Sequence, residues 1–289
     1  MRIIRTHLIL MLLAITLGCT EDVEKNGGII DEGGIEVSQW EQVWADEFDS
    51  EEIDESKWNK IQWRPGWVNN EQQAYTDRDI NLYLDDGNLV IQGLIEPGYY
   101  GTDYTGTAYN SDYTSGRMNT DDKVSWTYGR FDIRAKLPKG KGSWPAIWML
   151  PTDNTYGTWA SSGEIDIMEM VGHEPSTYLG TLHYGGKWPK NKHSGKPYKL
   201  PSGTFADDFH VFSIVWEEGK IHWAIDGKSW QTQMEWSSEG GKFPAPFDKR
   251  FHLLLNLAVG GNWPGAPDAK TKFPAQLLVD YVRVYQLAK

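Results

Sequence analysis

Cysteine is nearly absent from this chain of 289 residues, and basic residues are too few to balance the acidic ones. The single cysteine, Cys19, excludes an intrachain disulfide, a redox pair and a thiolate metal site. With 28 Lys and Arg against 40 Asp and Glu, the formal net charge is −12. Because an acidic protein repels phosphate backbones, no nucleic-acid partner is expected. Long amphipathic helical patterns are also missing, which argues against a helical fold.

A hydrophobic run long enough to cross a bilayer is missing as well. The apolar run at residues 8–17 follows two arginines, is too short to span a membrane and fits the apolar region of an export signal. Cys19 follows this run and a glycine, as in the lipobox of bacterial lipoproteins. We therefore expect residues 1–18 to be a lipoprotein-type signal peptide and Cys19 to be a lipid anchor. A plain secretory signal is the alternative.

The segment at residues 19–39 is acidic, has two glycine pairs and shows no sustained apolar period, which indicates a flexible tether. From Trp40 onward there is no second linker and no internal repeat, so residues 40–289 are expected to form one domain. The sequence thus predicts an exported, monomeric lipoprotein of the outer membrane or cell surface. A secreted or periplasmic location is the alternative.

What the chain does have is the pattern of β-strands. Residues 131–137 alternate between apolar and polar side chains, which predicts a half-exposed strand. Asp226-Gly227 separates two short runs and signals a two-residue hairpin. The near-continuous apolar run 251–259 predicts a central strand, and residues 277–287 alternate again. The predicted fold is all-β, an antiparallel sandwich or jelly roll.

Three carboxylates crowd into the segment GEIDIMEMVG at residues 163–172. On a strand, Glu164 and Asp166 share one face, but the odd spacing to Glu169 would place this third acid on the opposite face. Met168 is the residue that breaks the alternation. A β-bulge absorbs one extra residue and would return Glu169 to the acidic face.

Such a cluster suits glycoside hydrolysis. Four strand steps separate the two glutamate backbones by roughly 13 Å. Side chains that lean together could reach the separation of about 5–5.5 Å found in retaining glycosidases. Mutual repulsion should raise at least one pKa, as a proton donor beside a nucleophile requires. A solvated acidic face or a calcium site is the alternative for this stretch alone.

Aromatic residues near this segment favour a sugar site. In residues 142–150, Trp144 and Trp148 share one strand face with Ala146, which suits a stacking platform for sugar rings, although core packing is the alternative. His183 stands alone between Leu182 and Tyr184, where a structural role is the commoner one.

Six segments together resemble glycoside hydrolase family 16, and within it the bacterial laminarinases, which are endo-1,3-β-glucanases and endo-1,3(4)-β-glucanases. They are GEIDIMEMVG, GRFDIRAKLPKGKGSWPAIWMLP, NNEQQAYT, TLHYGG, PFDKRFHLLLNLAVGGNWPG and VDYVRVYQ. The resemblance runs from about Trp40 to the C-terminus. Met168 matches the bulged E-x-D-x-x-E branch, which also contains agarases and carrageenases. The family implies a β-jelly-roll sandwich of two antiparallel sheets with a concave substrate cleft.

The resemblance also implies residue roles. Glu164 is then the nucleophile, Asp166 its assisting carboxylate and Glu169 the general acid/base. The matching substrate-binding positions are Asn69, Arg117, Trp144, Trp148, His183 and Trp263. The positions that match a structural calcium site of the family are Glu47, Gly87 and Asp280. No cofactor is implied for catalysis.

The expected function is that of an endo-acting retaining β-glucanase that hydrolyses β-1,3-glucan (laminarin), mixed-linkage β-1,3/1,4-glucan or both. An agarase- or carrageenase-type galactan hydrolase is one alternative, and the acidic net charge weighs against its anionic substrates. A non-catalytic glycan-binding lipoprotein is another. It is disfavoured because a pure binder has no need of three mutually repelling carboxylates. The sequence does not choose between the two β-glucan types.

Overall fold

The computed structural model describes residues 39–288, which form seventeen strands and no α-helix. The predicted signal peptide, Cys19 and all of the predicted tether except Gln39 lie outside the described residues. Within the described part, no helix is long and apolar enough to cross a membrane.

The strands follow one another closely along the chain. Their bounds are β1 Trp40–Asp46, β2 Asn59–Lys60, β3 Gln73–Tyr75, β4 Leu82–Asp85, β5 Asn88–Thr102, β6 Ala108–Ser115, β7 Arg117–Asn119, β8 Gly129–Lys136, β9 Ser143–Pro151, β10 Glu164–Glu169, β11 Thr177–Gly185, β12 Asn191–Lys199, β13 His210–Glu217, β14 Lys220–Ile225, β15 Lys228–Gln233, β16 Phe251–Val259 and β17 Ala275–Leu287.

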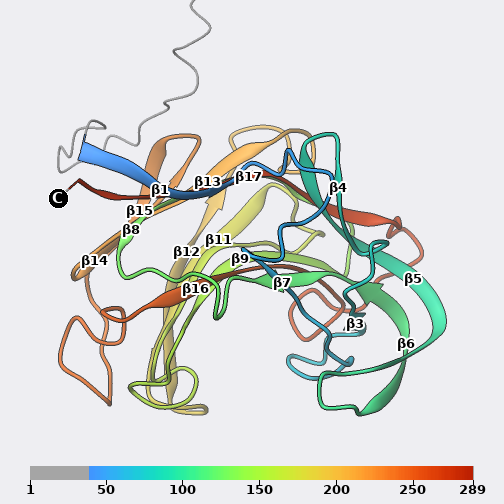
Figure 1. Ribbon diagram of the computed structural model, residues 1–289, viewed down its shortest axis with the longest axis horizontal. Helices are drawn as coiled ribbons and strands as arrows, with labels where there is room; N and C mark the ends of the chain where they lie inside the picture. The colour runs from blue at the N-terminus through green and yellow to red at the C-terminus, as the bar shows by residue number, and fades with distance from the viewer. Residues whose placement is uncertain (1–38, 289) are drawn as a thin grey trace, which may run out of the picture.

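The strands form two sheets that lie face to face (Figure 1). The ten-stranded sheet has the order β15-β14-β13-β8-β17-β5-β6-β3, with β1 also on β17 and β4 also on β5. The seven-stranded sheet has the order β12-β11-β10-β9-β16-β7-β2. Neighbouring strands pair antiparallel except β3 and β6, which are parallel. The predicted all-β jelly-roll sandwich of two antiparallel sheets is confirmed.

The core lies between the two sheets. All nine residues of β16 are buried, and β16 pairs with β9 on one side and β7 on the other, which confirms the predicted central strand at 251–259. The ten-stranded sheet contributes large side chains to the same core, among them Trp216 and Trp223, which have no exposed surface. Inward side chains of both sheets interdigitate, as in other β-sandwiches.

Two local predictions have different outcomes. The turn between β14 and β15 is formed by Asp226 and Gly227, both with positive φ (49° and 76°), so the predicted hairpin is confirmed. The half-exposed strand predicted at 131–137 is β8, but its polar face is only partly exposed. Asp132 is buried because the Arg130 guanidinium beside it, at 3.0 Å, neutralises its charge.

The predicted bulge in β10 is confirmed by its register. Against β9, the pairing shifts between Asp166 and Met168, and against β11 it shifts between Asp166 and Glu169. Ile167 and Met168 are both buried in the core, so two consecutive side chains of β10 face the core. Glu169 is thereby returned to the face that carries Asp166.

Candidate active site

The three carboxylates of β10 line one pocket of about 290 Å³ on the seven-stranded sheet. β9 supplies its partners on one side, because Asp166 pairs with Trp148 and Glu169 pairs with Ala146. Residues paired in neighbouring strands project to the same face of a sheet. The pocket floor is therefore built by the pleat of β9, β10 and β16. The other lining residues are Trp63, Val68, Asn69, Glu71, Tyr75, Arg117, Trp144, Leu150, Trp159, Asn256 and Ala258.

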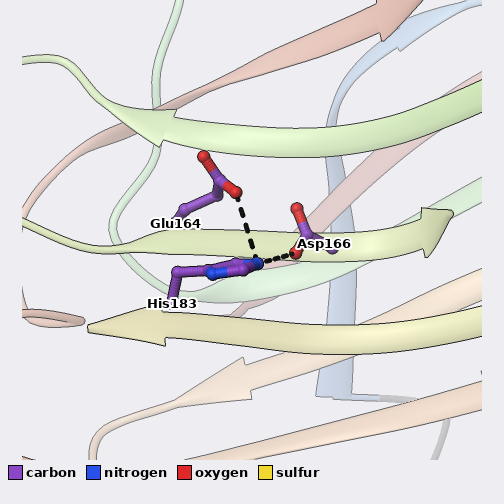
Figure 2. A group of neighbouring side chains, drawn as sticks. All are labelled: Glu164, Asp166 and His183. Carbon is purple, nitrogen blue, oxygen red and sulfur yellow. Dashed lines mark ion pairs between the residues drawn. The ribbon is translucent and has the colours of Figure 1, made fainter. Parts of the chain in front are cut away.

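His183 lies beside two of these acids (Figure 2). It pairs with Glu164 across β10 and β11, so both side chains project from the same face. Its Nε2 lies 3.2 Å from Oδ2 of Asp166 and 3.6 Å from Oε1 of Glu164, and Figure 2 shows the ring turned toward both. A protonated imidazole here would favour the charged form of both carboxylates.

Two indoles hold the outer pair of acids. Nε1 of Trp159 donates to Oε2 of Glu164 at 2.8 Å, and Nε1 of Trp144 donates to Oε1 of Glu169 at 3.2 Å. Hydrogen bonds to an ionised carboxylate stabilise its charge, and the shorter bond falls on Glu164. Each contact favours the ionised form of its own glutamate, and the shorter bond gives Glu164 the stronger support.

Burial is the main cause of the raised pKa values in the pocket. It raises the pKa of Glu164 to about 8, and repulsion from Asp166 adds to this. The pKa of Glu169 also rises to about 8, for the same two causes in the same order. Burial raises the pKa of Asp166 as well. The sequence predicted a raised pKa from like-charge repulsion, but removal from water is the larger effect.

A chain of hydrogen bonds extends from the aromatic floor. Nε1 of Trp148 donates to Oδ1 of Asn256 at 2.7 Å, and Nδ2 of Asn256 donates to the hydroxyl of Tyr75 at 3.2 Å. The Tyr75 hydroxyl in turn donates to Oε2 of Glu71 at 3.3 Å. These hydrogen bonds fix the orientation of the Trp148 ring, which is half-buried. The ring can therefore act as a rigid surface, as the predicted stacking platform requires.

Arg117 lies against the aromatic wall. Its guanidinium is 4.2 Å from the ring centroid of Trp63 and 4.9 Å from that of Trp148, within cation–π range. Burial lowers the pKa of Arg117, although the charges of Tyr75 and Glu71 oppose this. A buried guanidinium in the pocket wall can donate to the hydroxyl groups of a sugar.

The structure brings the predicted catalytic residues and most predicted substrate-binding residues together. Asn69, Arg117, Trp144 and Trp148 line the pocket. Trp263 stands at its edge, where its exposed ring meets Trp144 edge-on at 5.4 Å.

Several pocket residues were missed by sequence reasoning. Asn256 had a signal, because it and His252 are the two polar side chains inside the apolar run 251–259. Glu71 had one too, as the third residue of the NNE motif. Trp63 and Trp159 had none, since both lie in segments without a regular pattern, and only the fold brings them to the pocket.

The residues predicted for calcium lie away from this pocket, on or near the ten-stranded sheet. Both carboxylates already have arginine partners. Glu47 accepts two hydrogen bonds from Arg283, at 2.9 and 2.8 Å, and Asp280 accepts one from Arg134 at 2.6 Å. Two guanidinium groups compete with a cation for these oxygens, so a calcium ion there would have to displace both ion pairs. Calcium binding stays a prediction.

Within the described residues, one group of side chains has the donor atoms to hold a metal ion. The ligand atoms of Glu164, Asp166 and His183 all lie within 4.8 Å of one another. Two carboxylates and an imidazole are ligands that Zn²⁺ accepts. Glu164 and Asp166 line the pocket described above and His183 lies beside them, so an ion there would occupy the place of these acids.

Comparisons with known proteins place this geometry in a family. The family model described as "Glycosyl hydrolases family 16" matches residues 55–283. The chain is 48% identical over 261 residues to "Glucan endo-1,3-beta-glucosidase A1" of Niallia circulans, covering 84% of this chain and 37% of that relative. It is 40% identical over 284 residues to "Beta-glucanase" of Rhodothermus marinus, covering 95% of this chain and 93% of that relative. Among solved structures, the laminarinase catalytic domain from Thermotoga maritima is similar with a TM-score of 0.74 and 40% identity, covering 87% of this chain and 100% of that one.

Proposed function

The chain belongs to glycosyl hydrolases family 16, and we propose that it is an endo-acting, retaining β-glucanase that hydrolyses β-1,3-glucan, mixed-linkage β-1,3/1,4-glucan or both. The observation that carries this proposal is the bulge in β10, which turns Glu164 and Glu169 into one aromatic-lined pocket. The names of the relatives, a glucan endo-1,3-β-glucosidase and a β-glucanase, support the substrate class.

The roles follow from the surroundings of each acid. Glu164, which accepts a hydrogen bond from Trp159, attacks the anomeric carbon and forms a covalent glycosyl-enzyme. Glu169, which keeps its proton because it is buried beside other acids, protonates the departing glycosidic oxygen. Water then attacks the same carbon, Glu169 takes a proton from it, and Glu164 leaves as the carboxylate. Asp166 and His183 position Glu164 and tune its charge.

The aromatic surfaces supply the binding energy. Pyranose rings present apolar C–H faces that pack on indoles, and the Trp148 and Trp144 rings line the pocket directly in front of the acids. Arg117 and Asn69 offer donors for sugar hydroxyls at the same floor. Together they hold the glycosidic oxygen close to the Glu169 carboxyl.

The test is product analysis on defined polysaccharides. The wild-type protein should release reducing sugar from laminarin or barley β-glucan, with longer oligosaccharides and not glucose as early products, and it should leave agarose intact. NMR of the first-formed anomer should show β, because two displacements restore the configuration. First-formed α-anomer would remove the nucleophile role of Glu164. Release from agarose alone would favour the galactan alternative, and binding of laminarin without release would favour a glycan-binding protein.

We further propose, from the sequence alone, that the protein is an exported lipoprotein anchored through Cys19. Cys19→Ala should move the protein from the membrane fraction to the soluble fraction of cells. Equal membrane association of both forms would overturn the anchor. The proposal of a monomer is tested on the protein without residues 1–18 by sedimentation equilibrium.

Calcium binding is a separate proposal, supported by the family resemblance of Glu47, Gly87 and Asp280. A ligand that binds only the native state raises its stability by mass action, so calcium added after chelation should raise the melting temperature. The ion pairs with Arg283 and Arg134 oppose this. An unchanged melting temperature would rule out calcium binding at these residues.

A further inference from the structure

The hairpin of β11 and β12 concentrates positive charge in an otherwise acidic chain. Residues 187–199 contain five lysines and no acid, whereas the whole chain has a net charge of −12. We call this segment the lysine hairpin; its lysines are Lys187, Lys190, Lys192, Lys196 and Lys199. All five are exposed.

These lysines are not neutralised by neighbouring acids. In the part of the chain that the structure describes, no carboxylate forms an ion pair with any of the five. The one contact of a lysine head group is with a neutral side chain, from Nζ of Lys192 to Oγ of Ser237 at 3.4 Å. Glu239 is the acid that approaches the segment, with its carboxylate against Gly186. The lysine hairpin therefore keeps a positive local field.

The lysine hairpin borders the catalytic pocket. β12 is the edge strand of the seven-stranded sheet and is separated from β10 only by β11. The main-chain N–H of Trp188 donates to the carbonyl of Trp159 at 3.0 Å, and the Trp159 indole holds Glu164. The ring of His193 lies 5.8 Å from the ring of His183.

Trp188 lies in the turn before β12, between Lys187 and Lys190. A turn closes around it, because the N–H of Lys190 donates to the carbonyl of Lys187 at 2.8 Å. With 69% of its surface exposed, Trp188 has the largest exposed fraction among the large hydrophobic side chains of the described residues. An exposed indole flanked by two ammonium groups combines a surface for a sugar ring with donors for an anion.

We propose that the lysine hairpin is a subsite for anionic groups, carboxylates or sulfate esters, on the glycan chain that occupies the cleft. Trp188 packs on the sugar face, and Lys187 and Lys190 pair with the anionic substituent. This inference rests on the proposed function and goes beyond its neutral β-glucan substrates, since it assigns an anionic substituent to one end of the same cleft.

The net charge of the chain does not oppose this subsite. At physiological salt, charges further away than about 8 Å are largely screened, so the lysines nearest the sugar outweigh distant acids. Single exposed ion pairs are weak. Lys187 and Lys190, which flank Trp188, act together, chiefly by speeding association, and this effect falls with salt.

The test compares two polymers that differ only in charge. Glu164→Gln protein, which binds without turnover, is titrated with neutral β-1,3-glucan and with carboxymethylated β-1,3-glucan of matched length, at low and at high salt. We expect roughly threefold or greater preference for the carboxymethylated polymer at low salt, lost at high salt. Lys187→Ala/Lys190→Ala should abolish the preference, and Trp188→Ala should weaken binding of both polymers.

A matched control removes the same charge elsewhere. Lys139→Ala/Lys270→Ala changes two exposed lysines outside the hairpin and should keep the preference. Equal affinity for both polymers, or equal loss in both double variants, would overturn the subsite. So would competition by inorganic polyphosphate as strong as by the carboxymethylated glucan, since the segment would then attract any polyanion. Absence of wild-type turnover on laminarin with the preference intact would count against the proposed function and leave the subsite standing.

Discussion

The indole of Trp223, on the ten-stranded sheet, donates a hydrogen bond of 2.9 Å to the main-chain carbonyl of Asp166, at the bulge of the seven-stranded sheet. A bulge disrupts the ladder locally, and a buried carbonyl without a partner is costly. Trp223 satisfies this carbonyl across the core. Gly180 makes room for the ring, because a Cβ at that position would lie 2.4 Å from it. One sheet thus holds the bulge that carries the proposed catalytic acids of the other.

This contact predicts an activity defect from a core substitution. Trp223→Phe should lower the free energy of unfolding by about 1–3 kcal/mol, the cost of a buried unsatisfied group, and should lower kcat because the bulge shifts. Trp216→Phe is the matched control, since its indole also donates to a carbonyl, that of Phe247 at 3.1 Å. Denaturant unfolding and kcat on laminarin are the measurements. An equal kcat loss in both variants would argue against the special role of Trp223.

Removal of either outer acid should stop turnover without stopping binding. Glu169→Ala should reduce kcat by about 10²- to 10⁴-fold, the range of general acid–base catalysis. Glu164→Ala should cost at least as much, because no nucleophile remains. Calorimetry should show that both variants still bind laminarin oligosaccharides. Normal kcat in either variant would exclude the assigned role of that residue.

Met168 should matter for its place in the chain and not for its side chain. Deletion of Met168 removes the extra residue, turns Glu169 toward the core and should abolish activity while destabilising the fold. Met168→Leu keeps the residue count and nearly the volume, so it should cost less than about 1.5 kcal/mol and retain activity. Turnover and thermal unfolding of both variants check this. An active deletion variant would contradict the assignment of the bulge.

Trp148 should be more important for substrate than for stability. Trp148→Ala removes a half-buried ring and its hydrogen bond to Asn256, so we expect a large loss of kcat/KM on polymer and a melting temperature only a few degrees lower. Trp58→Ala calibrates the core effect, because Trp58 is 1% exposed and its loss should cost about 3–5 kcal/mol. A Trp148 variant as unstable as the Trp58 variant would identify the ring as core.

The basic limb of the pH–rate profile should report Glu169. Its pKa of about 8 lies above the ordinary value of 4.5, so the proton donor is lost as pH rises through that region. Asp166→Asn removes a negative charge that raises this pKa, and the basic limb should move to lower pH. Measurement of kcat against pH for the wild type and for Asp166→Asn tests this shift. An unmoved limb would mean that burial alone sets the proton on Glu169.

The same pKa values set a pH dependence of stability. A carboxyl whose folded pKa exceeds its unfolded value binds more protons when folded, so it stabilises the fold most below the unfolded pKa. This contribution from Glu164 and Glu169 is lost as pH rises from about 4.5 to about 8. Glu169→Gln should therefore have a flatter melting temperature over this window than the wild type.

The sequence was informative where the decisive interactions are local. The two-residue period of β10 and its interruption at Met168 sufficed to predict the bulge, because strand periodicity is a property of neighbouring residues. Asp226-Gly227 fixed its own turn for the same reason, since few residue pairs adopt two successive positive φ values. The acids, the two tryptophans of β9 and the central strand were likewise predicted from patterns within nine or ten residues.

Tertiary structure decided what depends on distant segments. Trp223 meets Asp166 across 57 positions of sequence, and Trp148 meets Asn256 across 108. Arginine partners for Glu47 and Asp280 and the place of the lysine hairpin beside the pocket also depend on which strands become neighbours. The sequence by itself thus determined which acids β10 carries and the local geometry that places them on one face. The packing of the two sheets determined how deeply the acids of β10 are buried, how far their pKa values rise and which side chains surround them. Desolvation arises only when distant strands exclude water together.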